Sequence, residues 1–201
     1  MTCPNVYRNP VRLLLAICLF AGSLAGATTY RELDLDSLLQ KAQIAFYGEV
    51  REVSVEDRDG EPWTRVRFEV RDDLFAEDAL DEVGDGAAGD GSRDNGEEGE
   101  GSSRELLFYG GELPGLTLNV TGMPQFSPGD EVIVLAYDAD YYSPIVGFNQ
   151  GLWRLGASGF RDPQGRILSL GPDSVLVRDG AGAGTADLVR ALQQALEEAR
   201  P

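Results

Sequence analysis

The chain has 201 residues, of which 34 are acidic and 17 are basic, so its formal net charge at pH 7 is −17. Phosphate backbones and anionic lipid surfaces are bound by clustered basic side chains, and Lys41 is the only lysine. We therefore expect neither a nucleic acid nor a membrane surface to be a partner. The chain contains no histidine, which excludes an imidazole base and a histidine-ligated zinc ion.

Residues 1–27 have the parts of an export signal in the expected order. Two arginines precede an apolar stretch over residues 13–24, and residues 25–27 read Ala-Gly-Ala. We expect cleavage of this signal peptide between Ala27 and Thr28 and export to the periplasm, the cell envelope or the medium. A membrane anchor is the alternative, but the apolar stretch is shorter than the ~20 residues that a spanning helix needs.

The two cysteines, Cys3 and Cys18, both lie inside the expected signal, so the exported chain would have neither a thiol nor a disulfide. A lipid anchor on Cys18 is another alternative, but Ile17 stands where lipoprotein signals carry a small residue. Residues 28–201 fall within the length of one domain that a hydrophobic core can stabilise without cross-links. We expect a single acidic, secreted domain.

The first expected elements are a helix and a bent strand. Residues 34–44 carry leucine and alanine at a helical spacing, and Asp34 stands in position to cap the first turn. Residues 44–56 then have the composition of a strand, but their apolar positions change parity after Val50. Such a change indicates a bulge or a bend, which Gly48 would permit.

A hairpin is expected next. Residues 57–60 read Asp-Arg-Asp-Gly, which is a turn sequence, and residues 63–72 alternate between apolar and charged side chains. Val66, Phe68 and Val70 would face a core, and the arginines and glutamates between them would face solvent.

Residues 77–104 contain ten acidic residues, two arginines and seven glycines. A segment of this composition cannot bury enough apolar surface to offset its ordering entropy, so we expect a disordered acidic insertion between two strands. Calcium binding is the alternative, because carboxylates are its usual ligands. Residues 90–94 imitate the start of a helix–loop–helix calcium loop, but Asn95 and Gly101 stand where a glycine and a glutamate are needed. We expect no metal ion and no cofactor.

The remainder of the chain predicts short strands and a closing helix. The expected strands cover residues 105–109, 116–121, 132–137, 145–148, 152–155, 167–170 and 175–177. Residues 132–137 are continuously apolar, which indicates a strand covered on both faces. Thr185 stands where it could cap a final amphipathic helix.

Together these elements predict a mostly β fold. Closure of short strands into a barrel removes exposed sheet edges, so we expect a small antiparallel barrel, closed or partly open in the manner of an OB fold. An N-terminal and a C-terminal helix would pack on this barrel.

Four segments carry a resemblance to a known family. Between Asp34 and Leu155 they read AQIAFYGEV, RVRFEVRDDL, GGELPGLTLNVTGMPQFSPGDEVIVL and PIVGFNQGLWRL. This succession resembles a family of exported bacterial proteins of unknown function with a small barrel-like domain. Some members look as though they accompany matrixin-like metalloproteases, and the resemblance then implies an inhibitor or accessory role.

The pattern of this family falls on glycines and their neighbours, namely Gly48, Gly110, Gly111, Gly122, Pro124, Phe126, Gly129, Gln150 and Gly151. The chain departs from the pattern at Gln43, where the family has Asp, and at the acidic insertion, where the family has a short turn. Glycines of this kind usually serve turns and close backbone approaches. The alternative is that Gly110, Gly111 and Glu112 present amides to an anion, although no lysine follows as in a phosphate-binding loop.

Catalytic candidates are few. Without an imidazole or a thiol, paired carboxylates are the main remaining option. The candidates are Glu49, Glu69, Glu112, Asp130 and Glu131. Each of them also fits the outer face or the end of a strand, and the sequence places no two of them at a separation suited to hydrolysis. We expect no enzymatic activity, with a carboxylate-based hydrolase as the alternative.

Binding is the function that residues 137–142, Tyr-Asp-Ala-Asp-Tyr-Tyr, favour. Exposed tyrosines can stack on sugars or dock against a protein, so Tyr141 and Tyr142 are candidates for contact with an exported protein or a glycan. The alternative is a loop whose tyrosines fold back on the domain. A protease inhibitor is a third hypothesis, but the barrel inhibitors of metalloproteases use an amino-terminal cysteine that residues 28–201 lack.

Overall fold

The computed structural model describes residues 31–75, 102–172 and 175–200. The chain divides into two units, Met1–Arg31 and Glu32–Pro201, and the elements below belong to the second. The expected signal with its cleavage point after Ala27, and residues 77–101 of the expected insertion, lie outside the described residues. Among the described residues, no helix has the length and the hydropathy to cross a bilayer.

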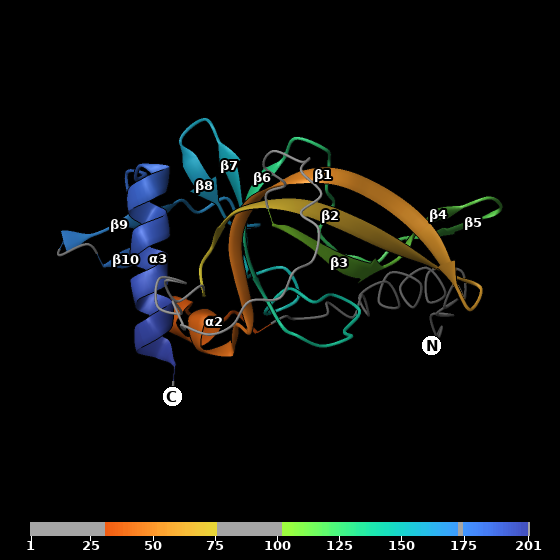
Figure 1. The fold of residues 1–201 in the computed structure, drawn as a ribbon, viewed down its shortest axis with the longest axis horizontal. Helices are drawn as coiled ribbons and strands as arrows, with labels where there is room; N and C mark the ends of the chain where they lie inside the picture. Colours follow the sequence, from red (N-terminus) through yellow and green to blue (C-terminus); the bar gives the residue numbers. More distant parts are fainter. Residues whose placement is uncertain (1–30, 76–101, 173–174, 201) are drawn as a thin grey trace, which may run out of the picture. The chain divides into compact units, whose positions relative to one another are not determined.

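The main feature of the fold is a six-stranded antiparallel sheet with the strand order β3-β2-β1-β6-β7-β8 (Figure 1). Its strands are β1 (Ile44–Arg58), β2 (Glu61–Asp73), β3 (Ser103–Tyr109), β6 (Glu131–Ala136), β7 (Leu152–Gly156) and β8 (Gly159–Arg161). β1 and β2 form the expected hairpin, in which Arg58 pairs with Glu61 beside the turn. The prediction of a mostly β protein is confirmed.

Of the two forms expected for the barrel, closed or partly open, the closed form is wrong. Closure would require the two outer strands, β3 and β8, to pair with each other, and in the described part of the chain they do not. β8 is only three residues long, and the chain turns away directly after it, where Gly165 N donates to Asp162 O at 2.9 Å. The sheet therefore stays open: among the described residues, the outer side of β8 makes only a single bridge, from Arg161 to Ile167, and β3 forms the other edge.

Two short hairpins lie outside the main sheet. β4 (Gly111–Leu113) pairs with β5 (Leu116–Leu118), and β9 (Leu168–Leu170) pairs with β10 (Leu176–Arg178). The β4–β5 hairpin contacts β1 and β2 near the end of their hairpin, whereas β9 and β10 contact the C-terminal helix (Figure 1).

The first helix, α2 (Leu35–Lys41), is capped by Asp34 as expected. The Asp34 carboxylate accepts a hydrogen bond from Ser37 N at 2.7 Å. The helix ends three residues earlier than its predicted end at residue 44, because Gln43 N already donates to Ala136 O at 2.8 Å and the chain enters β1.

The second helix, α3 (Thr185–Ala199), already includes the residue that was expected to cap it. Thr185 is the first helical residue, and Gly184 occupies the N-cap position without a side-chain hydrogen bond. The prediction that Thr185 caps this helix is therefore wrong.

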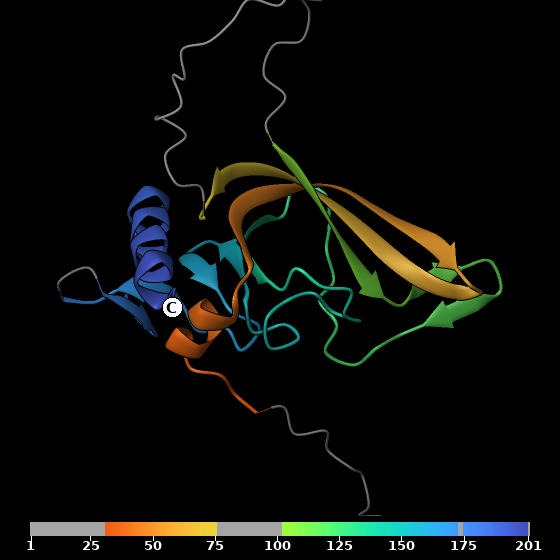
Figure 2. The ribbon, with the colours of Figure 1, turned by 60° about the horizontal axis from the view of Figure 1, so that its bottom comes forward.

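β1 bends as its change of apolar parity predicts. Its pairing with β2 shifts register between Tyr47 and Gly48 and again between Val50 and Glu52. Gly48 lies so close to β2 that a Cβ atom there would be 2.4 Å from the carbonyl oxygen of Glu69. The first part of β1 pairs with both β2 and β6, and its second part continues with β2 alone (Figure 2).

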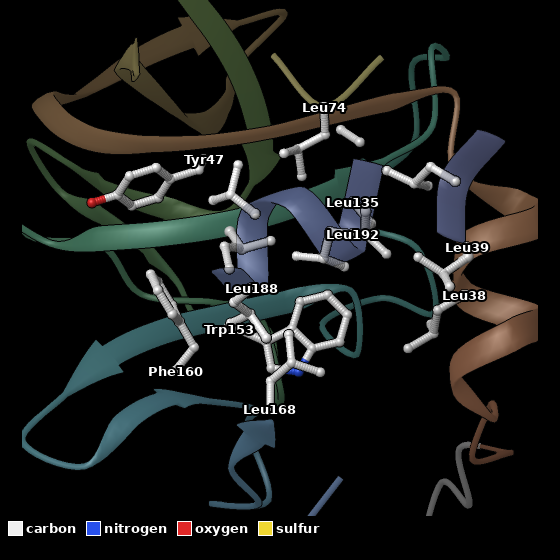
Figure 3. Close-up of a cluster of buried hydrophobic side chains, with 14 of the residues drawn as sticks. Leu38, Leu39, Tyr47, Leu74, Leu135, Trp153, Phe160, Leu168, Leu188 and Leu192 are labelled. Carbon is white, nitrogen blue, oxygen red and sulfur yellow. The ribbon is translucent and has the colours of Figure 1, made fainter. Parts of the chain in front are cut away.

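Buried apolar side chains form two clusters that share β1 and β6. The helix-side cluster includes Leu38, Leu39, Tyr47, Ile133, Leu135, Trp153, Phe160, Leu168, Leu188 and Leu192 (Figure 3). The β3-side cluster includes Phe46, Val50, Val66, Phe68, Leu106, Phe108, Val132, Val134, Ile145 and Leu152. Successive residues of β6 alternate between the two clusters, so this strand is covered on both faces, as its continuous apolar sequence predicts.

One end of the expected disordered insertion, residues 77–104, is ordered. β3 begins at Ser103, which pairs with Glu69, and Arg104 forms a 2.5 Å ion pair with Asp73. The expected boundary at residue 104 is therefore two residues too late, because the ladder to β2 and this ion pair fix Ser103 and Arg104.

The strand expected at residues 145–148 is wrong. Only Ile145 makes a β-bridge, to Ala136. Gly147 and Phe148 follow with φ values of 65° and 72°, which produce a turn rather than an extended strand.

Candidate binding surface

The loop between β6 and β7 is exposed at its tyrosines. Tyr141 and Tyr142 keep 53% and 62% of their surface in contact with solvent. The Tyr142 ring also packs on the sheet, with its centroid 4.6 Å from that of Tyr109 and 6.0 Å from that of Trp63. The Tyr142 carbonyl accepts a hydrogen bond from Tyr109 N at 2.8 Å. Tyr142 therefore folds back on the domain and remains accessible at the same time.

Five aromatic residues from three parts of the chain gather here, and we call them the aromatic surface: Trp63, Tyr109, Tyr137, Tyr141 and Tyr142. Trp63 in β2 and Tyr109 in β3 are cross-strand partners whose ring centroids lie 5.1 Å apart in an edge-to-face arrangement. Tyr137 and Tyr141 form a second edge-to-face pair at 5.1 Å. Such contacts hold each ring in a defined orientation.

A groove of about 500 Å³ adjoins the aromatic surface. Trp63, Tyr137 and Tyr141 contribute to its wall, and β3 contributes one side. Its other lining residues are Ile44, Leu106, Leu107, Ala139 and Pro144, which are apolar, and Arg58, Arg65, Glu105, Asp138 and Asp140, which are charged. The groove thus combines apolar contact area with charges of both signs.

The two arginines of the groove are already engaged by neighbours. The Arg58 guanidinium lies over the Trp63 ring, with its Cζ atom 5.6 Å from the centroid, and 3.6 Å from the Glu56 carboxylate. Arg65 forms 2.6 Å ion pairs with both Glu56 and Glu105. Its hydrogen bonds to these carboxylates raise the pKa of the Arg65 guanidinium.

In the described part of the chain, the loop carboxylates, unlike these arginines, are not engaged by neighbouring side chains. Asp138 and Asp140 are exposed, and within the described residues neither carboxylate has an ion pair or a hydrogen bond. The loop itself is braced, because Asp138 N donates to Gln43 Oε1 at 3.0 Å. At the other end of the aromatic surface, burial and then a hydrogen bond to Glu61 raise the pKa of Tyr109 above 10.0, so its phenol stays protonated at neutral pH.

The glycine pair lies directly after the aromatic surface in the chain. Gly110 has a φ of 106°, its N–H donates to Pro62 O at 2.9 Å, and a Cβ there would be 2.8 Å from Leu118 O. A Cβ on Gly111 would be 2.9 Å from a valine side chain of β1, and Glu112 is exposed in β4. The Gly110 amide is therefore used within the fold, and both glycines occupy positions with no room for a side chain.

Sequence reasoning missed two residues of the aromatic surface, Trp63 and Tyr109, and included Tyr137 only as part of the loop at residues 137–142. The signal that could have found Trp63 and Tyr109 is the register of β2 and β3, which places them opposite each other. That register pairs two strands that are far apart in the sequence, and the periodicity of each strand alone does not determine it. Tyr137 is visible in the loop sequence, but its contact with Tyr141 depends on the fold of the loop.

The carboxylates considered as catalytic candidates are mostly engaged in ion pairs. Glu49 lies 2.7 Å from Arg51 and 2.6 Å from Arg71, and Glu131 lies 3.0 Å from Arg71. Glu69 and Asp130 pair with Arg51 and Arg154, respectively. In the part of the chain that the structure describes, no three histidine, cysteine or carboxylate side chains are placed to hold a metal ion.

Comparison of the chain with protein-family models, with curated proteins and with solved structures finds no match. The resemblance of its motifs to a family of exported bacterial proteins stays a prediction. The function is therefore argued from the geometry of the aromatic surface and its groove.

Proposed function

We propose that this protein is a non-catalytic binding domain that acts after export, once the signal is cleaved between Ala27 and Thr28. The aromatic surface and its groove form the contact site for an exported protein or a glycan. The observation that carries the proposal is the gathering of five aromatic rings beside an open groove, with Tyr141 and Tyr142 more than half exposed. Tyrosine and tryptophan dominate the energetics of protein interfaces, and their ring faces also stack on sugars.

The order of this surface supports the proposal. Tyr142 is held by two neighbouring rings and by the hydrogen bond from Tyr109 N to its carbonyl. Immobilising a free side chain on binding costs about 0.5–1.5 kcal/mol, and a ring that is already held avoids most of this cost. The surface thus favours binding without rearrangement.

We also propose that the fold is a partly open, OB-like barrel. β1, β2, β3, β6 and β7 all contribute side chains to the β3-side cluster, as strands of a curled sheet would. OB folds bind their ligands on the strand face and in the adjoining loops, which is where the aromatic surface lies here.

Binding to a glycan array and to an array of random ten-residue peptides tests this proposal. The purified protein should bind members of at least one array, and the double variant Tyr141→Ala/Tyr142→Ala should bind them at least about 30-fold more weakly, as expected when interface anchors are lost. Intrinsic fluorescence can follow the binding, because Trp63 lies in the aromatic surface while the other tryptophan, Trp153, is fully buried.

Val175→Ala is the matched control, because Val175 is an equally exposed apolar residue, 59% accessible, that does not line the groove. It should leave binding unchanged. Failure of the unmodified protein to bind either array would contradict the proposal, and so would equal losses in the double variant and the control.

A further inference from the structure

The outer edge of β3 carries backbone groups without a partner. On the inner side of β3, Gly110 N donates a hydrogen bond to Pro62 O at 2.9 Å, and Ser102 O accepts one from Val70 N at 2.7 Å. Since hydrogen-bonded and non-hydrogen-bonded pairs alternate in an antiparallel ladder, even-numbered residues of β3 direct their backbone groups toward β2. Odd-numbered residues, Glu105 and Leu107 among them, direct theirs to the free edge.

One hydrogen bond at this edge is already formed. Tyr109, the last odd-numbered residue of β3, donates its outward N–H to the Tyr142 carbonyl. The loop therefore occupies the end of the edge and leaves Glu105 and Leu107 without a backbone partner on that side among the described residues. Edge strands with such unpaired groups are templates for an added strand.

The groove runs beside this free edge. Its lining includes Glu105, Leu106 and Leu107 of β3 together with Tyr137 and Tyr141 of the loop. An extended polypeptide in the groove would reach the outward backbone groups of β3, and its alternate side chains would reach the aromatic and apolar lining.

The charge of the groove determines which polypeptide fits. Arg58 and Arg65 are engaged by Glu56, Glu105 and the Trp63 ring, whereas Asp138 and Asp140 have no charged partner in the described residues. The charged groups of the groove that have no charged partner within the described ranges are therefore negative. A lysine or arginine of the added strand would pair with these carboxylates and lie near the rings of Tyr137 and Tyr141, which attract cations.

The same argument disfavours occupants from this chain. A second copy carries the same formal charge of −17, so two copies repel each other at an edge that is itself acidic. Residues 76–101 contain ten acidic residues and one arginine, so they have the wrong charge as well.

We infer that the groove binds an extended, basic segment of another exported protein, which adds as a strand to the free edge of β3 and places a lysine or arginine at Asp138 and Asp140. This inference rests on the proposed function and names the partner class. Main-chain hydrogen bonds to Glu105 and Leu107 supply the affinity, and the aspartates select for positive charge.

The peptide array described above tests the charge selection. Peptides that bind should be enriched in lysine and arginine and depleted in aspartate and glutamate relative to the array. Asp138→Asn/Asp140→Asn should weaken their binding about tenfold at low salt and reduce its salt dependence. Glu197→Gln, which removes an exposed carboxylate of α3, is the matched control and should change neither.

A matched pair of substitutions tests the strand addition. Leu107→Pro removes the outward N–H without removing a hydrogen bond to β2, and proline is tolerated at such edge positions. Leu107→Ala removes the same side chain but keeps the N–H. The proline variant should bind the selected peptides at least about tenfold more weakly than the alanine variant. N-methylated peptides give the same test on the unmodified protein. Each selected peptide is made in two forms, methylated at its odd-numbered or at its even-numbered backbone nitrogens, and one of the two forms should lose binding.

The outcomes separate the inference from the proposed function. Binding of glycans alone, with loss in Tyr141→Ala/Tyr142→Ala, would overturn the inference and leave the proposed function standing. Peptide binding without enrichment of basic residues, or binding that survives both methylation patterns, would also overturn the inference. A dimer in sedimentation that dissociates in Leu107→Pro would assign the edge to a second copy instead.

Discussion

Tyr47 joins the hydrophobic core to a group of charged side chains. Its ring belongs to the helix-side cluster and packs edge-to-face on Phe160. Its hydroxyl donates to the Glu131 carboxylate at 2.6 Å and accepts from Arg71 Nη1 at 2.9 Å. One residue therefore couples packing to electrostatics, which makes stability depend on pH.

The direction of that dependence follows from two shifted groups. The hydrogen bond from Tyr47, with a further contribution from Arg71, lowers the pKa of Glu131 below its ordinary value of 4.5. The stabilisation from Glu131 is therefore present above about pH 4.5 and is lost as the pH falls through the lower folded value. Burial and the bond to Glu131 raise the pKa of Tyr47 above 10.0, so its contribution is present below pH 10 and is lost as the pH rises through the folded value.

Tyr47→Phe removes the hydroxyl but keeps the buried ring. We expect the free energy of unfolding to fall by about 1–2 kcal/mol near neutral pH, because Glu131 loses a donor. The destabilisation caused by Tyr47→Phe should become smaller as the pH falls below 4.5 and through the lowered folded pKa of Glu131, because the protonated carboxyl no longer needs the Tyr47 donor as an anion does. Urea unfolding at a series of pH values measures it.

Tyr137→Phe is the control for that series, since its hydroxyl has no hydrogen bond among the described residues. A Tyr47→Phe penalty that is the same at every pH would show that the hydroxyl acts without Glu131.

At the scale of one element, β1 depends on the absence of a side chain at Gly48. A Cβ there would be 2.4 Å from a backbone oxygen of β2, whereas at Gly156 in β7 the nearest atom would be at 3.7 Å. Neither glycine has a positive φ, so the two positions differ in space and not in backbone strain. The bulge at Gly48 is thus a packing requirement of the β1–β2 pair.

Gly48→Ala should lower the free energy of unfolding by about 2–4 kcal/mol, because β1 and β2 must move apart to admit the methyl group. Gly156→Ala should change it by less than about 1 kcal/mol. Chemical denaturation of both variants measures the difference. Equal effects would mean that the bend in β1 tolerates a side chain at Gly48.

Local patterns predicted local elements well. Three local features of the sequence are found in the β1–β2 hairpin, namely the turn at residues 57–60, the alternation over residues 63–72 and the change of apolar parity after Val50. The exposed tyrosine pair could be read from the loop sequence, but the Trp63–Tyr109 pair beneath Tyr142 could not. Its formation depends on the pairing of β2 with β3 across the insertion, and a single-strand pattern contains no information on that pairing.

At the scale of the whole molecule, the sequence did not reveal that the sheet stays open. Alternating strands are equally compatible with a closed barrel and with an open sheet, because both bury one face of each strand. The difference depends on β8, which is too short to continue the sheet, and on the turn after it. Only the arrangement in three dimensions shows that β3 keeps a free edge.

Replacing residues 76–101 with a Gly-Ser linker of about ten residues should preserve the fold. Val70 N donates to Ser102 O, so these two residues lie side by side. Phe75 lies five residues beyond Val70, so a linker from Phe75 to Ser102 has to span roughly 17 Å. A shorter loop costs less closure entropy, and the free energy of unfolding should rise by about 1 kcal/mol. Urea denaturation measures it.

A variant in which residues 76–101 are shuffled keeps the length, composition and charge of the segment and is the control. Its stability should equal that of the unmodified protein. Loss of the folded state in the linker variant would mean that specific residues of the segment are required for folding.

β6 lies between the two halves of the hydrophobic core. Ile133 and Leu135 belong to the helix-side cluster, whereas Val132 and Val134 belong to the β3-side cluster. Neither half can lose its order while the other survives, because separating this strand from its neighbours exposes both. Heating should therefore give a single cooperative transition, with equal calorimetric and van't Hoff enthalpies, although the core has two parts.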